Sequence, residues 1–576
     1  MKVLLRSCLV LALCLTLPAY AQRSAVQAGR GMVVSAHHLA SQAGIEIMRQ
    51  GGNAIDAAVA TGFALAVTYP RAGNLGGGGF MIVQTADGEE VALDFREVAP
   101  SAAHRDLYLD ADGNIIPRAS THGYLANGVP GTVAGLHHAW ARYGSGQVSW
   151  AAVLEPARRL AADGFTVSPA LAQDLIASTT LLSANAESKR IFLRDGRPYA
   201  AGDRLCQPDL AATLARLQAH GAREFYEGET AALIAADQAQ GGGLITAADL
   251  AAYRPVEREP IRFTYRGFEF VTMPPPSSGG IALAQMFGLL EPYDLREMGL
   301  HSTTYIHLVT EAMRRAFRDR AEFLGDPDFY PVPQEALLSP ATLEHHAASF
   351  DPQHATPSEG LAPAPIPSAE STETTHFAAV DAAGNVASCT YTLNGLYGNG
   401  VTAAGTGVLL NNEMDDFTSK VGVKNMFGLI QGESNAIAPG KRPLSSMTPT
   451  IVSRDGKPYL VTGSPGGPTI ITTVLQVSLN VIDHQLPLTL AVDAPRFHHQ
   501  WQPDQIYREP FLASPDTLDA LEAMGHTLAL RRLYRNEAVQ AARYWGDAES
   551  ILIDPETGML EGVSDRRSPE AAPAGF

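Results

Sequence analysis

The middle of the chain contains an abrupt change in composition, and this change constrains the fold more than any other feature. Residues 351–373 hold five prolines among Ala, Ser and Glu and almost no apolar side chains, which is the composition of a linker. From Thr374 onward the sequence alternates between apolar and polar residues and contains a turn at 381–385, so it predicts a hairpin of two strands. A flexible segment therefore ends directly at a threonine that begins a strand.

A threonine in that position has two interpretations. A threonine hydroxyl is a weak nucleophile unless a base lies beside it, and an N-terminal threonine carries its own base in its α-amine. That amine has an ordinary pKa of about 7.7 to 8.0, so it is partly neutral at physiological pH. Thr374 becomes N-terminal only if the chain is cut before it, and a linker tolerates such a cut. From the residues alone, however, adjacent threonines at a strand start are more often β-formers than nucleophiles.

The region before the linker is expected to contain helices and a glycine-rich turn. Residues 39–50 predict a helix, and Asn53 is expected to cap a second one through Asp56. The four glycines at 76–79 lack the GxGxxG spacing and are not followed by Lys-Ser/Thr, so we expect close backbone packing there and no phosphate site. Two strands follow around a turn at 86–88.

Residues 144–343 read as mainly helical. One of these helices, at about 307–317, carries two arginines, and a third follows directly after it. The three are expected to form a solvated face: Arg314, Arg315 and Arg318. A later helix is expected to begin near Thr469.

Charge and the first residues limit where the protein acts. The chain carries a formal net charge of −18 at pH 7, which argues against nucleic acids and anionic membranes as partners because both attract basic surfaces. Residues 1–21 combine Lys2 and Arg6 with a short apolar run and end in Ala-Tyr-Ala, which is typical of a secretory signal peptide cut after Ala21. The run is too short to span a bilayer, for which roughly 20 residues are needed.

Cysteine usage gives little. Beyond the expected signal only Cys206 and Cys389 remain, so a disulfide framework is excluded and one bridge between them stays open. Neither a cysteine cluster nor an HExxH pattern predicts a metal site.

Several further stretches occur in a fixed order along the chain. They are RAGNLGGGGF, LDFREVAP, NGVPGT, MPPPSSGG, TETTHF, TYTLNG, LLNNEMDDF, KRPLSSMTPTIV, VTGSPGGPTIITTVLQ and APRFHHQW. With these motifs the chain resembles the γ-glutamyltransferases, also called γ-glutamyl transpeptidases, especially those secreted by Gram-negative bacteria. The resemblance covers nearly all of the chain after the expected signal.

The resemblance implies an α+β fold, the αββα four-layer sandwich of N-terminal-nucleophile hydrolases. One precursor would cleave itself between Glu373 and Thr374 into a large subunit, residues 22–373, and a small catalytic subunit, residues 374–576. The activity implied is transfer or hydrolysis of the γ-glutamyl group of glutathione and related amides through an ester on Thr374. Amino acids, short peptides or water would accept the group, no cofactor would take part, and the location would be the periplasm.

The resemblance also implies residue roles. Thr392 would hydrogen-bond the nucleophile, and Gly466 and Gly467 would form the oxyanion hole, where consecutive glycine amides can converge on a negative oxygen. The residues implied to bind the zwitterionic end of the glutamyl group are Arg96, Ser445 and Ser446 for its carboxylate and Asn394, Glu413 and Asp416 for its ammonium. Taken singly, Arg96 would pass for a surface ion pair and Asp415-Asp416 for a solvated turn.

The resemblance further implies a lid and two structural histidines, and two alternatives stay open beside it. A lid over the glutamyl pocket would lie between Asp416 and Glu433, with Phe427 where a relative has Tyr, so one hydrogen bond from the lid would be missing. His498 and His499 are expected to be structural. A cephalosporin (glutaryl) acylase is the alternative within the fold, but its substrate lacks the α-amino group that Asn394, Glu413 and Asp416 would bind. An uncut, inactive protein of the same fold is the alternative outside catalysis.

Overall fold

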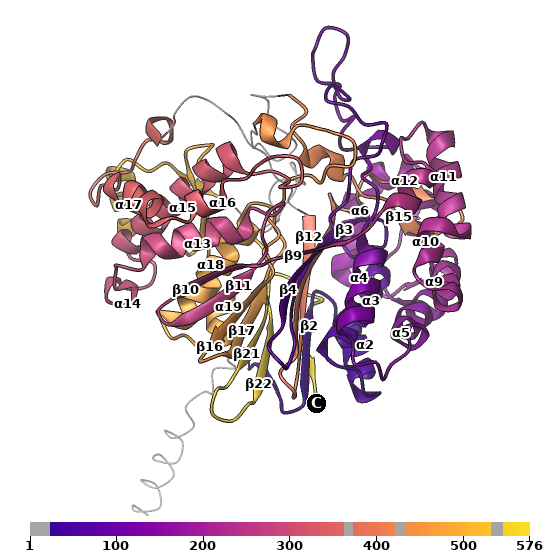
Figure 1. The fold of residues 1–576 in the computed structure, drawn as a ribbon, viewed down its shortest axis with the longest axis horizontal. Coiled ribbons are helices and arrows are strands. Elements are labelled where there is room, and N and C mark those ends of the chain that lie inside the picture. Colours follow the sequence, from indigo (N-terminus) through magenta and orange to yellow (C-terminus); the bar gives the residue numbers. More distant parts are fainter. Residues whose placement is uncertain (1–23, 362–372, 421–431, 532–544) are drawn as a thin grey trace, which may run out of the picture.

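The computed structural model describes residues 24–361, 373–420, 432–531 and 545–576. Two seven-stranded sheets lie face to face between two layers of helices, with the first helices of the chain on one side and the later ones on the other (Figure 1). Every pairing within the two sheets is antiparallel. The predicted αββα four-layer arrangement is therefore present.

The first sheet contains the strand that begins at the linker. Its strands, in spatial order, are β23 (Ala574–Gly575), β2 (Gly31–Ser35), β12 (Glu373–Asp381), β13 (Val386–Asn394), β3 (Gly78–Gln84), β4 (Glu90–Asp94) and β9 (Val256–Arg258). The expected hairpins, β12 with β13 and β3 with β4, both occur as neighbours. β12 lies inside the sheet, between β2 and β13.

The second sheet takes four of its strands from the last third of the chain. In spatial order they are β1 (Val26–Ala28), β22 (Leu560–Ser564), β21 (Glu549–Ile553), β17 (Lys457–Gly463), β16 (Thr450–Arg454), β11 (Phe268–Thr272) and β10 (Ile261–Tyr265). Figure 1 shows this sheet beside the first one, with the yellow strands β21 and β22 from the end of the chain in it.

Three apolar clusters lie between the layers of the fold. Alternate residues of a strand belong to different clusters, because they point to opposite faces of the sheet. In β12, Phe377 and Ala379 belong to the cluster under the first helical layer, whereas Ala378 and Val380 face the second sheet. This is the period of two expected for a strand buried on both faces. The first layer is built on α2 (His38–Arg49), α3 (Ala54–Thr68), α4 (Thr132–Tyr143), α5 (Trp150–Asp163) and α9 (Pro208–His220). The second is built on α13 (Gly279–Leu290), α15 (Thr303–Phe323), α18 (Thr469–Ile482) and α19 (Leu488–Asp493).

Local predictions in the first part are confirmed. Asn53 caps α3, because its side-chain oxygen accepts from the amides of Ile55 and Asp56. The carboxylate of Asp56 in turn accepts from the Asn53 amide, which completes a capping box. The glycine run packs as expected: a Cβ on Gly77 would stand 1.9 Å from the carbonyl oxygen of Thr392. Only a residue without a side chain allows the chain to approach β13 so closely.

Smaller elements fill the periphery. The remaining helices are α6 (Pro169–Ala177), α7 (Thr179–Ser183), α8 (Ala186–Phe192), α10 (Arg223–Glu227), α11 (Glu229–Gly241), α12 (Ala247–Ala252), α14 (Leu295–Met298), α16 (Gln334–Leu337), α17 (Pro340–Ala348) and α20 (Pro515–Ala523). The remaining strands are β5 (Phe165–Thr166), β6 (Leu193–Arg194), β7 (Arg197–Pro198), β8 (Arg204–Leu205), β14 (Thr402–Ala403), β15 (Val408–Leu409), β18 (Phe497–His498), β19 (Ile506–Arg508) and β20 (Leu528–Leu530). Among the described helices, none is both long and apolar enough to cross a membrane.

The expectation for the arginines of α15 is wrong. Arg314 and Arg315 are buried and share the carboxylate of Glu311, one turn earlier on the helix. Arg315 also donates to the carbonyl oxygens of His346 and Ser349. Arg318 is only slightly exposed and pairs with Asp319 and Glu322. These side chains attach α15 to neighbouring segments, because a buried guanidinium requires partners for its five N–H groups.

The first half of the predicted linker has a defined structure. Residues 351–361 pack against the second helical layer and contain a 3₁₀ turn, η2 (Ser358–Leu361). Ser358 accepts from Arg314 through its hydroxyl and donates from its amide to Asp504 at 2.7 Å. Polar contacts of this kind hold a segment that has almost no apolar side chains to bury. The rest of the predicted linker, 362–372, lies outside the described residues.

Candidate active site

Thr374 lies at the edge of the space between the two sheets. Its place in β12 has the same parity as Ala378 and Val380, so its side chain points to the face between the sheets, and it is buried. The register sets Thr374 directly opposite Thr392 on β13, with an irregularity between Glu373 and Thr374. Thr375 points to the other face, where its hydroxyl is buried and has no hydrogen-bond partner among the described residues.

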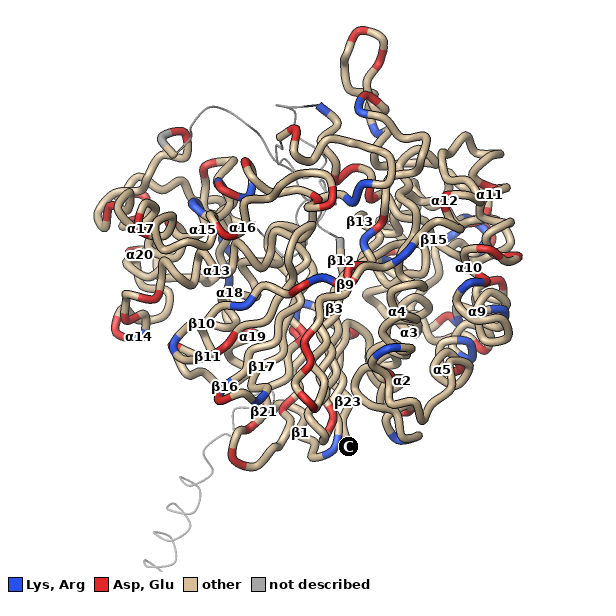
Figure 2. Tube along the Cα trace, viewed as in Figure 1, with Lys and Arg blue, Asp and Glu red and all other residues tan. Residues whose placement is uncertain are grey.

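Seven of the predicted residues surround one small cavity. Together with Glu373, Asn394 and the two glycines, they come from six separate motifs of the sequence. The cavity is lined by Arg96, Thr374, Thr392, Glu413, Asp416, Ser445, Ser446, Met447 and Ile470. Figure 2 shows basic and acidic segments meeting near the labels of β12, β13 and β9. A hydroxyl at a strand start thus shares a cavity with one cation and two acids.

The charged residues of this cavity are buried and form ion pairs with one another. Arg96 follows β4 and donates to Glu413 and Asp416, which begin and end the 3₁₀ helix η3 (Glu413–Asp416). Its guanidinium also donates to the carbonyl oxygens of Pro443 and Leu444, each at 3.3 Å. The side chains of Arg96, Glu413 and Asp416 are each no more than 1% exposed. They are neither a surface pair nor a solvated turn.

A third acid in this group was missed by the sequence analysis. Glu97 is fully buried, and one of its carboxylate oxygens lies 3.7 Å from Arg96 Nη1. Burial raises the pKa of Glu97 to about 7 and that of Glu413 to about 8, although Arg96 opposes both shifts. The direction is physically sound, because one guanidinium cannot neutralise three buried carboxyl groups. The signal in the sequence was the position of Glu97 immediately after Arg96 in DFREVAP.

The two serines are held by a loop from the first part of the chain. Ser445 donates from its amide to the carbonyl oxygen of Pro276 at 2.8 Å, and its own carbonyl oxygen accepts from the amide of Ser278 at 2.7 Å. The hydroxyls of Ser278 and Ser446 lie 3.4 Å apart, and Arg320 of α15 donates to Ser278 Oγ at 2.9 Å. The MPPPSSGG motif therefore fixes PLSSM.

Asn394 and the glycine pair lie near this cavity but do not line it. Asn394 ends β13 at a φ of 74°, donates from its amide to Thr392 Oγ1 at 2.7 Å and from its side chain to the carbonyl oxygen of Asn412. It therefore orients Thr392 and the chain that leads to η3. Gly466 and Gly467 form the turn between β17 and α18 at φ values of 126° and 59°, which favour glycine.

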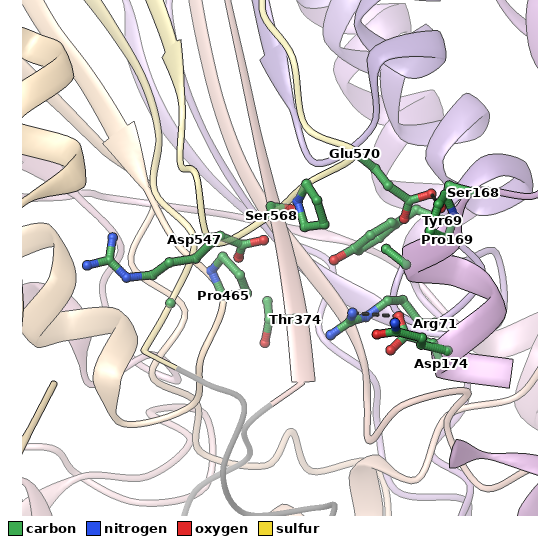
Figure 3. A pocket seen from close by; sticks show the side chains of 15 residues that line it. Tyr69, Arg71, Ser168, Pro169, Asp174, Thr374, Pro465, Asp547, Ser568 and Glu570 are labelled. Atoms are coloured by element: carbon green, nitrogen blue, oxygen red, sulfur yellow. Dashed lines mark hydrogen bonds and ion pairs between the residues drawn. The ribbon is translucent and has the colours of Figure 1, made fainter. Parts of the chain in front are cut away.

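Thr374 also borders a second and larger cavity of about 480 Å³. Figure 3 shows Thr374 between Asp547 and Pro465 on one side and Tyr69, Arg71 and Asp174 on the other. Pro465 immediately precedes the glycine pair. The nucleophile candidate thus touches both a small charged cavity and a roomier one.

Other predictions have mixed outcomes. Cys389 is buried in β13 and Cys206 is exposed, and both are free thiols. His498 donates to or accepts from Thr472 and Gln500, and His499 pairs with Asp504 and with the amide of Trp501, so both have structural contacts as expected. Phe427 and residues 1–21 lie outside the described residues, and so does the side chain of Glu373.

One group of side chains in the described part of the chain has the spacing of a metal site. His307, Glu311 and His526 place one ligand atom each within 4.8 Å of one another. The two histidines share a hydrogen bond of 2.8 Å, His307 Nε2 lies 2.8 Å from the carbonyl oxygen of Asp351, and Glu311 pairs with Arg314 and Arg315. Two guanidinium groups on the only carboxylate oppose a cation there.

Comparison with known proteins agrees with this geometry. The family model for gamma-glutamyltranspeptidase matches residues 40–575. The glutathione hydrolase proenzyme of Escherichia coli is 48% identical over 552 residues, which cover 96% of this chain and 93% of the relative.

The chain belongs to the gamma-glutamyltranspeptidase family.

Two solved structures are similar in fold to this chain. A cephalosporin acylase from Bacillus halodurans is 28% identical, covers 98% of both chains and has a TM-score of 0.84. The gamma-glutamyltranspeptidase of Helicobacter pylori is 43% identical over 57% of this chain and 93% of its own, with a TM-score of 0.56. The gamma-glutamyltranspeptidase family fold, that of an N-terminal-nucleophile hydrolase, is therefore confirmed for this chain.

Proposed function

We propose that the chain is a self-processing γ-glutamyl transferase and hydrolase that acts on glutathione and related γ-glutamyl amides. The observation that supports this most directly is the shared cavity, in which Thr374 at the start of β12 meets Arg96, Glu413, Asp416 and the two serines. A zwitterionic group requires both a cation and acids beside it, and this cavity supplies them next to a hydroxyl.

Processing would begin at the hydroxyl of Thr374. Its oxygen attacks the carbonyl carbon of Glu373, the bond from that carbon to the Thr374 nitrogen breaks, and the nitrogen takes up the hydroxyl proton. Water then cleaves the resulting ester between Glu373 and Thr374 Oγ1, which restores the hydroxyl and leaves a free α-amine. The large subunit would be residues 22–373 and the small catalytic subunit residues 374–576.

Catalysis would use the same hydroxyl with the new α-amine as its base. The oxygen attacks the γ-carbonyl carbon of the donor, and the amine carries the proton to the departing nitrogen. Gly466 and Gly467 would donate their amides to the negative oxygen of the intermediate. Thr392, opposite Thr374 in the sheet, would hydrogen-bond the nucleophile.

Donor recognition would replace contacts already present within the small cavity. The α-carboxylate would take the place of an acid on Arg96, with Ser445 and Ser446 as further donors, and the ammonium would lie on Glu413, Asp416 and Asn394. Planar guanidinium groups bind a carboxylate through two parallel hydrogen bonds, which lysine cannot do. Phe427 would lie in a lid above the group, without the hydroxyl of a tyrosine.

The alternative is acylase activity on a glutaryl side chain, which the likeness to the cephalosporin acylase of Bacillus halodurans brings into consideration. Turnover of γ-glutamyl-p-nitroanilide and glutaryl-p-nitroanilide by the cleaved protein distinguishes the two. We expect kcat/KM to be at least about 100-fold higher for the γ-glutamyl compound, since the glutaryl group leaves buried acids without an ammonium. A preference for the glutaryl compound would establish the alternative instead.

Secretion to the periplasm is proposed on the character of residues 1–21. Fractionation of a Gram-negative host that expresses the full sequence tests it: the protein should appear in the periplasmic fraction with Gln22 as its first residue. Recovery in the cytoplasm with residues 1–21 intact would contradict the proposal.

A further inference from the structure

A buried acid two residues before Arg96 holds the backbone of that arginine. Asp94 ends β4, and its Oδ1 accepts from the Arg96 amide at 3.0 Å. The carbonyl oxygen of Arg96 accepts from the hydroxyl of Tyr253, also buried, at 2.9 Å. Both backbone polar groups of the arginine that lines the small cavity are therefore fixed by buried side chains.

The same acid meets an arginine from the other side of the proposed cut. Arg442 lies three residues before Ser445, and its Nε is 3.3 Å from Asp94 Oδ1. The side chains of Arg442 and Asp94 are 8% and 0% exposed, so solvent ions screen their attraction little. Arg442 belongs to the proposed small subunit, whereas Asp94 belongs to the proposed large one.

Further contacts hold this ion pair in place. Arg258 of β9 donates from Nε to the second carboxylate oxygen of Asp94 at 2.7 Å. The amide of Arg442 donates to Asp326 Oδ2 at 2.8 Å, and Nη2 of Arg442 donates to the carbonyl oxygen of Arg254 at 2.9 Å. Arg442 is thus attached, through its backbone and its side chain, to three separate segments of the first part of the chain.

The segment 442–446 and Arg96 are joined twice. The guanidinium of Arg96 donates to two carbonyl oxygens of this segment, and the first residue of the segment, Arg442, pairs with the acid that holds the Arg96 amide. The two serines that line the small cavity end the same segment. The position of the guanidinium relative to the serine hydroxyls therefore depends on Asp94 and Arg442.

We propose that Asp94 and Arg442 are positioning residues for the α-carboxylate of the donor, and that their ion pair sets the guanidinium of Arg96 against the hydroxyls of Ser445 and Ser446. The inference deepens the proposed function and rests on it, since it concerns recognition of the γ-glutamyl group. Neither Asp94 nor Arg442 lines the small cavity, so both act through the residues that do.

The proposed cut explains why such a pair is needed. After cleavage, the residues that would bind the carboxylate belong to two polypeptides, so only non-covalent contacts set their relative position. Loss of either charge leaves the other buried without its partner, and the segments then rearrange. A displacement of about 1 Å in a group that positions a substrate can cost about 100-fold in activity.

The test uses three inhibitors that differ at one end of the molecule. L-Glutamate carries an α-amine and an α-carboxylate, glutarate lacks the amine, and 4-aminobutyrate lacks the α-carboxylate. Their competitive inhibition constants are measured on the cleaved protein with γ-glutamyl-p-nitroanilide as donor. The proteins compared are the original sequence, Asp94→Asn, Arg442→Met and Arg442→Lys.

We expect the effect to follow the carboxylate. Asp94→Asn and Arg442→Met should raise the donor KM and the inhibition constants of L-glutamate and glutarate at least about 10-fold, and lower kcat less than about 3-fold. The inhibition constant of 4-aminobutyrate should change less than about 2-fold, because this compound has no group for Arg96. Arg442→Lys keeps the charge beside Asp94 and should recover most of the lost affinity.

A second buried ion pair provides the matched control. Glu311→Gln removes the carboxylate shared by Arg314 and Arg315, and none of these residues lines the small cavity. This variant should unfold at a lower urea concentration, yet all three inhibition constants should stay within about 2-fold of the original.

Other results would overturn the proposal. Equal rises in all three inhibition constants in Asp94→Asn would indicate a general change of the site, and no rise in any of them would show that the pair is dispensable. Failure of both Asp94→Asn and Arg442→Lys to cut themselves would assign the pair to processing instead of donor recognition. Absence of donor turnover by the original protein would instead overturn the proposed function.

Discussion

At the scale of single residues, two adjacent threonines receive different surroundings from strand alternation. Thr374 points between the sheets into two cavities, whereas Thr375 points toward the first helical layer. Both residues carry the same hydroxyl group, but only the hydroxyl of Thr374 lies in a cavity with charged and polar side chains.

This difference predicts the outcome of two matched substitutions. Thr374→Ala should stay uncut and lose at least about 10³-fold in γ-glutamyl-p-nitroanilide turnover, because both the nucleophile and the new N-terminus are gone. Thr375→Ala should cleave normally. Denaturing gels and mass spectrometry of the purified proteins check both. Cleavage of Thr374→Ala between Glu373 and the new alanine would show that an external protease is responsible.

The buried acids predict how stability depends on pH. Folding raises the pKa of Glu413 to about 8, above the ordinary value of about 4.3. The folded state therefore binds the extra proton, so the stability this proton contributes is complete below about pH 4.3 and is lost as pH rises toward 8.

Comparison with a neutral side chain isolates this effect. In the uncut Thr374→Ala protein, the midpoint temperature of unfolding should fall between pH 5 and pH 8.5, and it should fall less when Glu413→Gln is added. Scanning calorimetry at several pH values gives both curves. Parallel curves would mean that Glu413 has an ordinary pKa in the folded protein.

At the scale of elements, helix α15 connects the second helical layer to the site. Arg320 supports Ser278 and through it the serines, while Arg314 and Arg315 hold Glu311 and the segments at 346–358. These contacts are polar and buried, so their loss leaves charges without partners.

Removing one of these arginines should therefore destabilise the protein strongly. Arg315→Ala should lower the free energy of unfolding by about 3 to 5 kcal/mol, because it breaks a buried ion pair and several hydrogen bonds to carbonyl oxygens. Arg142→Ala, at an exposed arginine of α4, should change it by no more than about 0.5 kcal/mol. Urea unfolding of the uncut Thr374→Ala protein measures both, and equal effects would contradict the structural role of α15.

The sequence predicted secondary-structure elements better than it predicted the burial and partners of individual side chains. The α3 capping box, both hairpins and the start of α18 follow from local patterns, and all four are confirmed. The burial of Arg96 and Arg315 does not follow from such patterns, because their partners Glu413 and His346 lie on other segments. Resemblance named Arg96 as a site residue, and the structure places it in the small cavity with Thr374. Glu97 and the larger cavity appeared only when distant segments were brought together.

At the scale of the whole molecule, the two proposed subunits both contribute strands to each of the two sheets. Residues after 373 supply β23, β12 and β13 to the first sheet and β22, β21, β17 and β16 to the second, and each group pairs with strands from the first part of the chain. The three apolar clusters of the sheets likewise contain residues from both sides of position 373.

The cleaved protein should therefore remain one particle. Size-exclusion chromatography in buffer without denaturant should give a single peak that contains both polypeptides in equal amounts. Added urea should separate them only at concentrations at which circular dichroism reports unfolding. A small subunit that elutes alone while it is still folded would contradict this arrangement.

The closed group around Arg96 has a consequence for how a donor enters. The guanidinium already pairs with Glu413 and Asp416, and the incoming glutamyl end has one positive and one negative group and no net charge. Binding is then an exchange of partners, in which each broken ion pair is replaced by an equivalent one and no counterion has to leave. Donor affinity should accordingly vary little with ionic strength, unlike that of a site that captures an anion from solution.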